Sequence, residues 1–346
     1  MGVQVVKKIF LILVGVIAVL LLVAGGILAV LYHRANQRFG LSEAEPVSHE
    51  TVADMGTRLR VVARPEAVTP LLLAYVPKER MPTLPVVSAL GLDFSKAVEM
   101  LMPREVALLG GSDFGAGQVR LTLFVNERRG GPASVEHLDL SDLLGRIPVV
   151  SWAATRLRMP QRGVLLLDGQ IPIPEEVETV VLERWSHRME GAPLSVYGGH
   201  FLEMVLDNRN GELMTLGASI AQGLDVDWQD AMKQPPLSMA VPVVEKIQEI
   251  RLHVDPEGLD ALTGNLRISG PPDVAGLSLL INIAVAEYIA KPLKEKHGMD
   301  LSGECVWDQA QGAVIGRYRI AGLDGYLRQR INAMFPDAPK PPQAGD

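Results

Sequence analysis

The sequence predicts an α+β fold in which a single N-terminal transmembrane helix precedes a mainly antiparallel-sheet domain with helices. Three features predict it: a 24-residue apolar run at residues 9–32, strand-like runs paired across turns, and apolar residues at helical spacing between those pairs. Of the 346 residues, 48% are apolar and 21% charged, so the chain can bury a sizeable core. This composition excludes a fibrous repeat and a wholly disordered polypeptide.

The apolar run at residues 9–32 contains no charged residue. At 1.5 Å per residue it would be about 36 Å long as a helix, enough to cross a hydrocarbon layer of about 30 Å. A cleaved signal peptide has a shorter apolar region of roughly 7–15 residues, so we expect an uncleaved anchor. Basic residues flank both ends of the run, and the orientation therefore rests on length, because residues 1–8 are too few to form a domain.

The predicted location is thus the inner (plasma) membrane, crossed once, with residues 1–8 as a short cytoplasmic tail. The large C-terminal part is extracytoplasmic, which means periplasmic in a bacterium. The lipid bilayer is the first expected partner, through residues 9–32.

Most of the small residues in this run share one face of the predicted helix: Gly15, Ala18, Gly25, Gly26 and Ala29. Small side chains let helices approach closely in lipid, where packing drives association. The face therefore predicts a membrane-helix interface, either in a homodimer or with a membrane-protein partner. The alternative is that glycine and alanine are simply common in membrane helices.

The exported part divides by composition. Residues 33–56 are polar and predict a linker, residues 57–335 predict the α+β domain, and the proline-rich residues 336–346 predict a disordered tail. The domain can consist of two or three subdomains, with breaks near 130–160 and 225–248.

Three segments of the domain begin alike, with a strand-like run, then Pro-Glu, then apolar residues at helical spacing: Arg58–Leu72, Gly163–Val181 and Glu249–Thr263. Each precedes a hairpin-like pair of strands. The expected pairs are Val106–Leu109 with Val119–Val125, Phe201–Leu206 with Glu212–Leu216, and Gly303–Trp307 with Val314–Ile320. This pattern predicts irregular βαββ repeats, although Pro and Glu are favoured in the first turn of any helix.

Two local patterns are specific. Around residue 252, Ile250, Leu252 and Val254 alternate with polar residues, which predicts a strand with one wet face. Apolar spacing predicts helices at Pro174–Glu190, Leu277–Ala290 and Leu323–Phe335. The second of these helices is apolar nearly all round but short for a membrane span, so we expect a buried core helix.

Charge and cysteine count exclude several function classes. Without Lys7 and Lys8, the chain carries 31 basic and 40 acidic residues, a balance of −9, which disfavours nucleic acid as a partner. Cys305 is the sole cysteine, so an intrachain disulfide and a CxxC motif are excluded. P-loop, HExxH and complete dinucleotide-binding motifs are absent from the sequence, and no cofactor is expected.

Two small groups of residues are candidates for chemistry. Ser195 and His200 could be neighbours in a catalytic triad, in which a histidine polarises a hydroxyl. Asp225, Asp227 and Asp230 offer oxygen ligands for a hard cation such as Ca²⁺, or they form a solvated acidic turn. No other metal site is expected.

The sequence therefore favours a membrane-anchored extracytoplasmic binding or scaffold protein of an envelope assembly. Whether it is an enzyme stays open, with the balance toward no. One alternative is a membrane-tethered hydrolase that acts on an envelope substrate. Another is a lipid-handling module in which Leu277–Ala290 lines an apolar cavity.

Overall fold

The structure is a computed structural model that describes residues 45–54, 56–69, 102–127, 135–139, 154–161, 163–175, 177, 198–223, 243 and 245–334. The predicted membrane helix at residues 9–32, its small-residue face and the predicted tail at 336–346 lie outside these residues. The candidates Ser195, Asp225, Asp227 and Asp230 lie outside them too.

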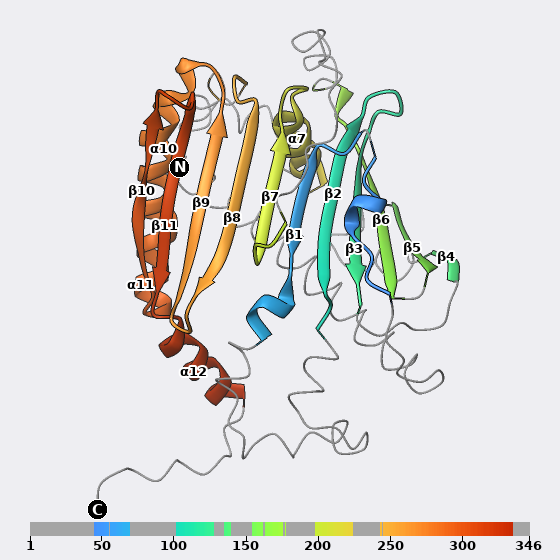
Figure 1. The fold of residues 1–346 in the computed structure, drawn as a ribbon. Coiled ribbons are helices and arrows are strands. Elements are labelled where there is room, and N and C mark those ends of the chain that lie inside the picture. Colours follow the sequence, from blue (N-terminus) through green and yellow to red (C-terminus); the bar gives the residue numbers. More distant parts are fainter. Residues whose placement is uncertain are drawn as a thin grey trace, which may run out of the picture.

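Eleven described strands form one antiparallel sheet in the order β10-β11-β9-β8-β7-β1-β2-β3-β6-β5-β4 (Figure 1). This confirms the predicted α+β class with an antiparallel sheet. The strands are β1 (Leu59–Ala63), β2 (Glu105–Asp113), β3 (Gln118–Asn126), β4 (Val135–Asp139), β5 (Ala154–Gln161), β6 (Val164–Pro172), β7 (Leu202–Asp207), β8 (Glu249–Glu257), β9 (Ala261–Ser269), β10 (Asp300–Asp308) and β11 (Ala313–Ala321).

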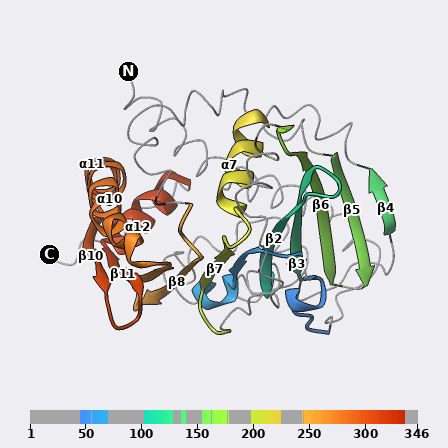
Figure 2. The same cartoon turned by 90° about the horizontal axis from the view of Figure 1, so that it is seen from above.

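Helices lie on both sides of the sheet. Viewed along the sheet, α7 and the α10–α11 segment lie on one side and the short helix η1 lies on the other (Figure 2). The described helices are η1 (His49–Thr51), η2 (Pro65–Val68), α7 (Glu212–Gly223), η4 (Pro272–Gly276), α10 (Leu277–Val285), the π-helix η5 (Ala286–Ala290), α11 (Lys291–His297) and α12 (Leu323–Met334).

The sheet consists of two halves with the same strand order. The first half runs β1-β2-β3-β6-β5 and the second runs β7-β8-β9-β11-β10, joined by the antiparallel pair of β1 and β7. Three strands of each half have nine residues and pair in the same register, first residue to last: β2, β3 and β6 in one half, and β8, β9 and β11 in the other. The two halves therefore correspond strand by strand, and the segment from Gly163 supplies β6 to the first half.

An approximate two-fold axis relates the two halves. It passes between Val61 and Met204, which are paired across β1 and β7. The backbone N–H of Arg64 donates to the carbonyl of Phe201, and the N–H of Asp207 donates to the carbonyl of Arg58, both at 2.8 Å. The axis exchanges these two hydrogen bonds. The same operation relates Ala107 to Arg251, Leu109 to His253, Gly111 to Asp255 and Phe124 to Arg267.

We call the sheet face that carries Arg60, Val62 and the residues paired with them the front face. In the first half an apolar patch of this face is covered, because the segment 45–57 packs across it through Val47, Val52 and Ala53. Its buried residues are Val62, Ala107, Leu109, Phe124, Val164 and Leu166. Gly111 is required here, since a Cβ atom would lie 2.0 Å from the carbonyl oxygen of Gly56.

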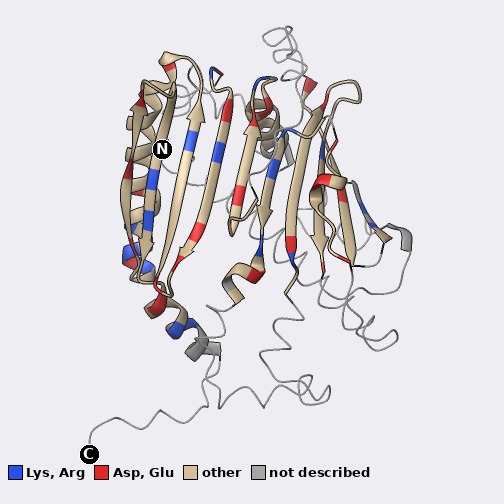
Figure 3. Cartoon of the chain, viewed as in Figure 1, with Lys and Arg blue, Asp and Glu red and all other residues tan. Residues whose placement is uncertain are grey.

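The front face of the second half is charged instead. Side chains directly opposite in an antiparallel sheet share a face, and one row across the sheet reads Glu203, His253, Asn265, Arg317 and Glu304. Figure 3 shows basic residues on β8, β9 and β11. Among the described segments, none packs across this face as 45–57 does in the first half, and we call it the open face.

The other face of the second half holds a core under α10. Buried residues there include Ile268, Val274, Leu277, Cys305 and Val314, with Ile250 and Leu266 packed against them. The predicted alternation around residue 252 is thereby confirmed, because Ile250 faces this core and Arg251 faces the opposite way.

The prediction that Leu277–Ala290 is a buried core helix was wrong. Only Leu277 in this range is buried, whereas Leu279 and Ile283 expose 65% and 53% of their surface. The helical segment Pro272–His297 is long and apolar enough to cross a membrane by length and composition. One side of it packs on β10 and β11, and the apolar residues on its other side were misread as core-facing.

Two of the three predicted hairpins are confirmed, as β2–β3 and β10–β11. The middle prediction was wrong in its second strand, because Glu212–Leu216 begins α7. Asn210-Gly211 is a strong hairpin signal, but here the side chain of Asn208 accepts the backbone N–H of Leu213 at 2.8 Å and supports a helix start.

A polar network at the centre of the sheet as the candidate functional site

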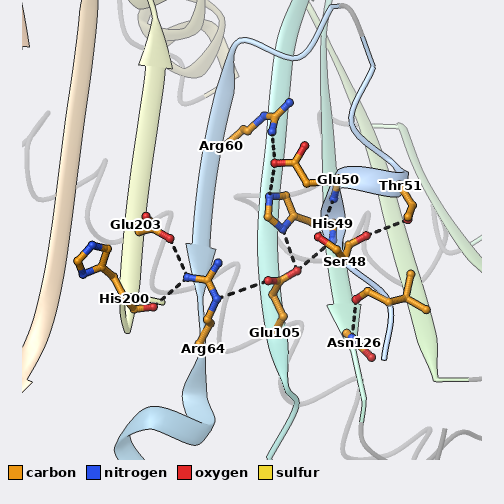
Figure 4. A network of polar contacts seen from close by, with 11 residues as sticks. Ser48, His49, Glu50, Thr51, Arg60, Arg64, Glu105, Asn126, His200 and Glu203 are labelled. Atoms are coloured by element: carbon orange, nitrogen blue, oxygen red, sulfur yellow. Dashed lines mark hydrogen bonds and ion pairs between the residues drawn. The ribbon is translucent and has the colours of Figure 1, made fainter. Parts of the chain in front are cut away.

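A network of charged side chains crosses the central strands β2, β1 and β7, close to the C-terminal end of β1 (Figure 4). Arg64, which follows β1, donates to Oε2 of Glu203 at 2.7 Å and to the carbonyl oxygen of His200 at 2.9 Å. Its Nε lies 3.7 Å from Oε2 of Glu105 on the other side. One guanidinium therefore joins both halves of the molecule.

The covering segment is tied into the same network. His49 in η1 is 2% exposed, and both its backbone N–H and its Nδ1 contact Oε1 of Glu105, at 3.0 and 2.8 Å. Burial raises the pKa of the Glu105 carboxyl, but hydrogen bonds from His49 and the charges of His49 and Arg64 outweigh it, so the net pKa lies below its ordinary value. Arg60, also buried, donates to Oε1 of Glu50 at 2.6 Å.

A histidine cluster continues the network onto β8. Nδ1 of His200 lies 2.5 Å from Oδ2 of Asp255, whose Oδ1 accepts the backbone N–H of Phe201 at 3.1 Å. The ring of His253 stacks on that of His200, with 4.2 Å between centroids and 22° between planes. Burial and the charge of His200 lower the pKa of His253, while Asp255 and Glu203 act in the opposite direction.

Of the predicted catalytic pair, the structure describes only His200. Its carboxylate partner is Asp255, and no hydroxyl or thiol of a described residue hydrogen-bonds to the ring of His200 or His253. A His–carboxylate pair can serve as a general base, and a nucleophile for it would have to come from outside the described residues. The prediction for Ser195 therefore stays a prediction.

Sequence reasoning missed His253 and Asp255 as partners of His200. The sequence does place these two residues together, because residues two apart in a strand point to the same face and His253 and Asp255 flank the apolar Val254. Pairing of β7 with β8, which sets His200 beside them, could not be derived from local pattern. His200, His253 and Asp255 also form the one group of potential metal ligands found among the described residues.

A groove lies on the open face beside this cluster. Its volume is about 430 Å³, and it crosses β9, β11 and β10. The lining residues are Thr263, Gly264, Asn265, Ser302, Gly303, Arg317, Tyr318 and Arg319. Within the groove, Arg319 pairs with Glu257 at 2.6 Å, whereas the guanidinium of Arg317 has no hydrogen bond or ion pair in the described part of the chain.

Comparison of the chain with protein-family models, with curated proteins and with solved structures found no match.

Proposed function

We propose that the chain is a membrane-anchored extracytoplasmic binding protein that holds an anionic group of its ligand in the groove across β9, β11 and β10. The observation that carries this proposal is the contrast between the two halves. The positions that form the covered apolar patch in the first half carry charged residues in the second, where Arg251 and Arg267 replace Ala107 and Phe124.

The groove supplies donors suited to an anion. Arg317 presents a guanidinium that none of the described residues engages, and that of Arg319, paired with Glu257, lies on the same strand two residues away. The guanidinium fork fits carboxylate and phosphate oxygens in a bidentate way. The side chains of Thr263, Asn265 and Ser302 add hydroxyl and amide donors to the same lining. A carboxylate or phosphate group placed there would gain several charge-assisted hydrogen bonds.

The membrane placement in this proposal rests on the apolar run at residues 9–32. With a short basic end in the cytoplasm, the groove would face the space outside the membrane, and the small-residue face of the anchor would support a homodimer or a membrane-protein partner within an envelope assembly.

The first prediction tests the groove. The full-length protein in detergent is titrated into a fluorescein-labelled hexaglutamate peptide, followed by fluorescence anisotropy, with inorganic phosphate as competitor. We expect Arg317→Gln to weaken binding roughly 10–100-fold, since a hydrogen bond to a charged group contributes about 1.5–3 kcal/mol. Arg328→Gln, at an exposed arginine of α12, should bind as the wild type does. Absence of binding to the wild type, or equal weakening by both variants, would contradict the proposal.

A membrane-tethered hydrolase is the second candidate, because His200 has the carboxylate partner that a triad histidine needs.

A further inference from the structure

We propose that His200, His253 and Asp255 bind a divalent transition-metal ion, with Zn²⁺ as the best fit. One ligand atom from each residue lies within 4.8 Å of the other two. Two imidazole nitrogens and one carboxylate oxygen are the ligand set of many zinc sites, which keep a fourth position for water or a substrate. This inference is independent of the proposed anion-binding groove.

The three ligand atoms lie near enough to one another to surround a single ion. Zn–N and Zn–O bonds of about 2.0–2.2 Å in a tetrahedral arrangement place neighbouring ligand atoms roughly 3.3–3.5 Å apart. Nδ1 of His200 and Oδ2 of Asp255 are 2.5 Å apart in a hydrogen bond. A zinc ion would replace this hydrogen bond, with an outward shift of the two side chains and a turn of the His253 ring, and neutral His200 would carry its proton on Nε2.

The backbone holds the three residues firmly. His253 and Asp255 are two apart on β8 and share the front face, and His200 lies two residues before the start of β7, which pairs with β8. The N–H of Phe201 holds Oδ1 of Asp255 and leaves Oδ2 for His200 or a metal. Arg64 donates a hydrogen bond to the backbone carbonyl oxygen of His200 and so holds this residue in position. Such supporting hydrogen bonds orient ligands at known metal sites.

The arginine of the network is paired and does not oppose a cation at the cluster. Arg64 forms ion pairs with Glu203, which lies directly opposite His253 on β7, and with Glu105. The side chains of His200 and Asp255 are 33% and 34% exposed, so an ion can enter from solvent and keep an open coordination position.

The fold itself does not need these side chains. The positions of His253 and Asp255 are occupied in the first half by Leu109 and Gly111, which lie under the covering segment. The same strand pairing therefore forms with an apolar residue and with glycine. The cluster occurs only in the half whose face is open, as expected for a site that meets an ion from solvent.

The test uses the full-length protein in detergent, freed of metal by a chelator and dialysed against Zn²⁺. We expect one zinc ion per chain to survive gel filtration, measured by mass spectrometry of the metal, and Co²⁺ to give the visible absorption of a tetrahedral site. His253→Gln and Asp255→Asn should each weaken binding by more than the roughly 10–100-fold that loss of a supporting residue costs.

His297→Gln is the matched control, because it removes a partly exposed histidine far along the chain on α11, and it should retain the zinc. Circular dichroism melts establish that each variant is folded. The proposal is overturned if the wild type retains no zinc, if the two ligand variants retain as much as the wild type, or if His297→Gln loses as much as they do.

Discussion

Glu212, the first residue of α7, is a carboxyl group buried to 1% exposure. Its Oε2 accepts the hydroxyl and the backbone N–H of Ser112 on β2, at 2.6 and 3.2 Å. Burial raises its pKa to about 7, against the opposing effect of the Ser112 hydrogen bonds and Arg58. In the folded protein the group therefore holds its proton over a pH range in which the unfolded chain has lost it.

This residue predicts a pH dependence of stability. The unfolded carboxyl titrates near 4.5 and the folded one near 7, so its contribution is fully present below pH 4.5 and is lost as pH rises to 7. The loss is about 3 kcal/mol by the usual conversion of a pKa difference. Urea unfolding between pH 4.5 and 8 should show this fall in the wild type relative to Glu212→Gln, whose amide does not titrate. Parallel curves for the two proteins would refute it, and exposed Glu287→Gln should follow the wild type.

At the scale of the element, α10 protects the edge of the sheet. β10 is the last strand, and an edge strand leaves backbone groups unpaired. Asn282 satisfies two of them: its Nδ2 donates to the carbonyl of Cys305 at 3.0 Å, and its Oδ1 accepts the N–H of Cys305 at 2.7 Å. One amide thus joins the helix to the strand and closes this part of the edge.

Asn282→Ala should lower the free energy of unfolding by roughly 1–3 kcal/mol, because it leaves both backbone groups of Cys305 without their partner. Leu279→Ala is the control on the same helix, since Leu279 is 65% exposed, and we expect a change within about 0.5 kcal/mol. Urea unfolding followed by circular dichroism measures both. Equal effects of the two substitutions would show that Asn282 does not join α10 to the edge.

Elements with strong local patterns could be predicted, and those defined by tertiary context could not. The β2–β3 and β10–β11 hairpins and α12 follow from alternation, turn residues and helical spacing. Glu212–Leu216 was misread because its apolar residues suit a strand as well as a helix, and the deciding contact comes from Asn208. In the candidate site, His200 was found by residue type, but Asp255 required the pairing of β7 with β8.

At the scale of the whole molecule, the two halves share one strand arrangement but differ in what their front faces carry. In the first, residues 45–57 complete a core over the front face, helped by the ion pairs of Arg60 and His49. In the second, the equivalent face carries the groove and the histidine cluster. The twofold relation predicts which positions correspond, so each residue of the open face can be compared with the equivalent residue of the covered face.

This division can be measured through cysteine labelling. Ala107→Cys places a thiol under the covering segment, at a position that is fully buried. Arg267→Cys places one on the exposed front face of β9. Cys305 supplies only a low background, because it is buried and burial raises the pKa of its thiol.

The difference in exposure between the two front faces is tested most directly by the rate of maleimide labelling of these two variants. The rate is measured in the folded full-length protein and normalised to the rate in denaturant. We predict that Arg267→Cys reacts at close to the denatured rate and that Ala107→Cys reacts far more slowly. If the thiol at position 267 is as protected as that at 107, the second half has no open face and the proposed binding groove is wrong.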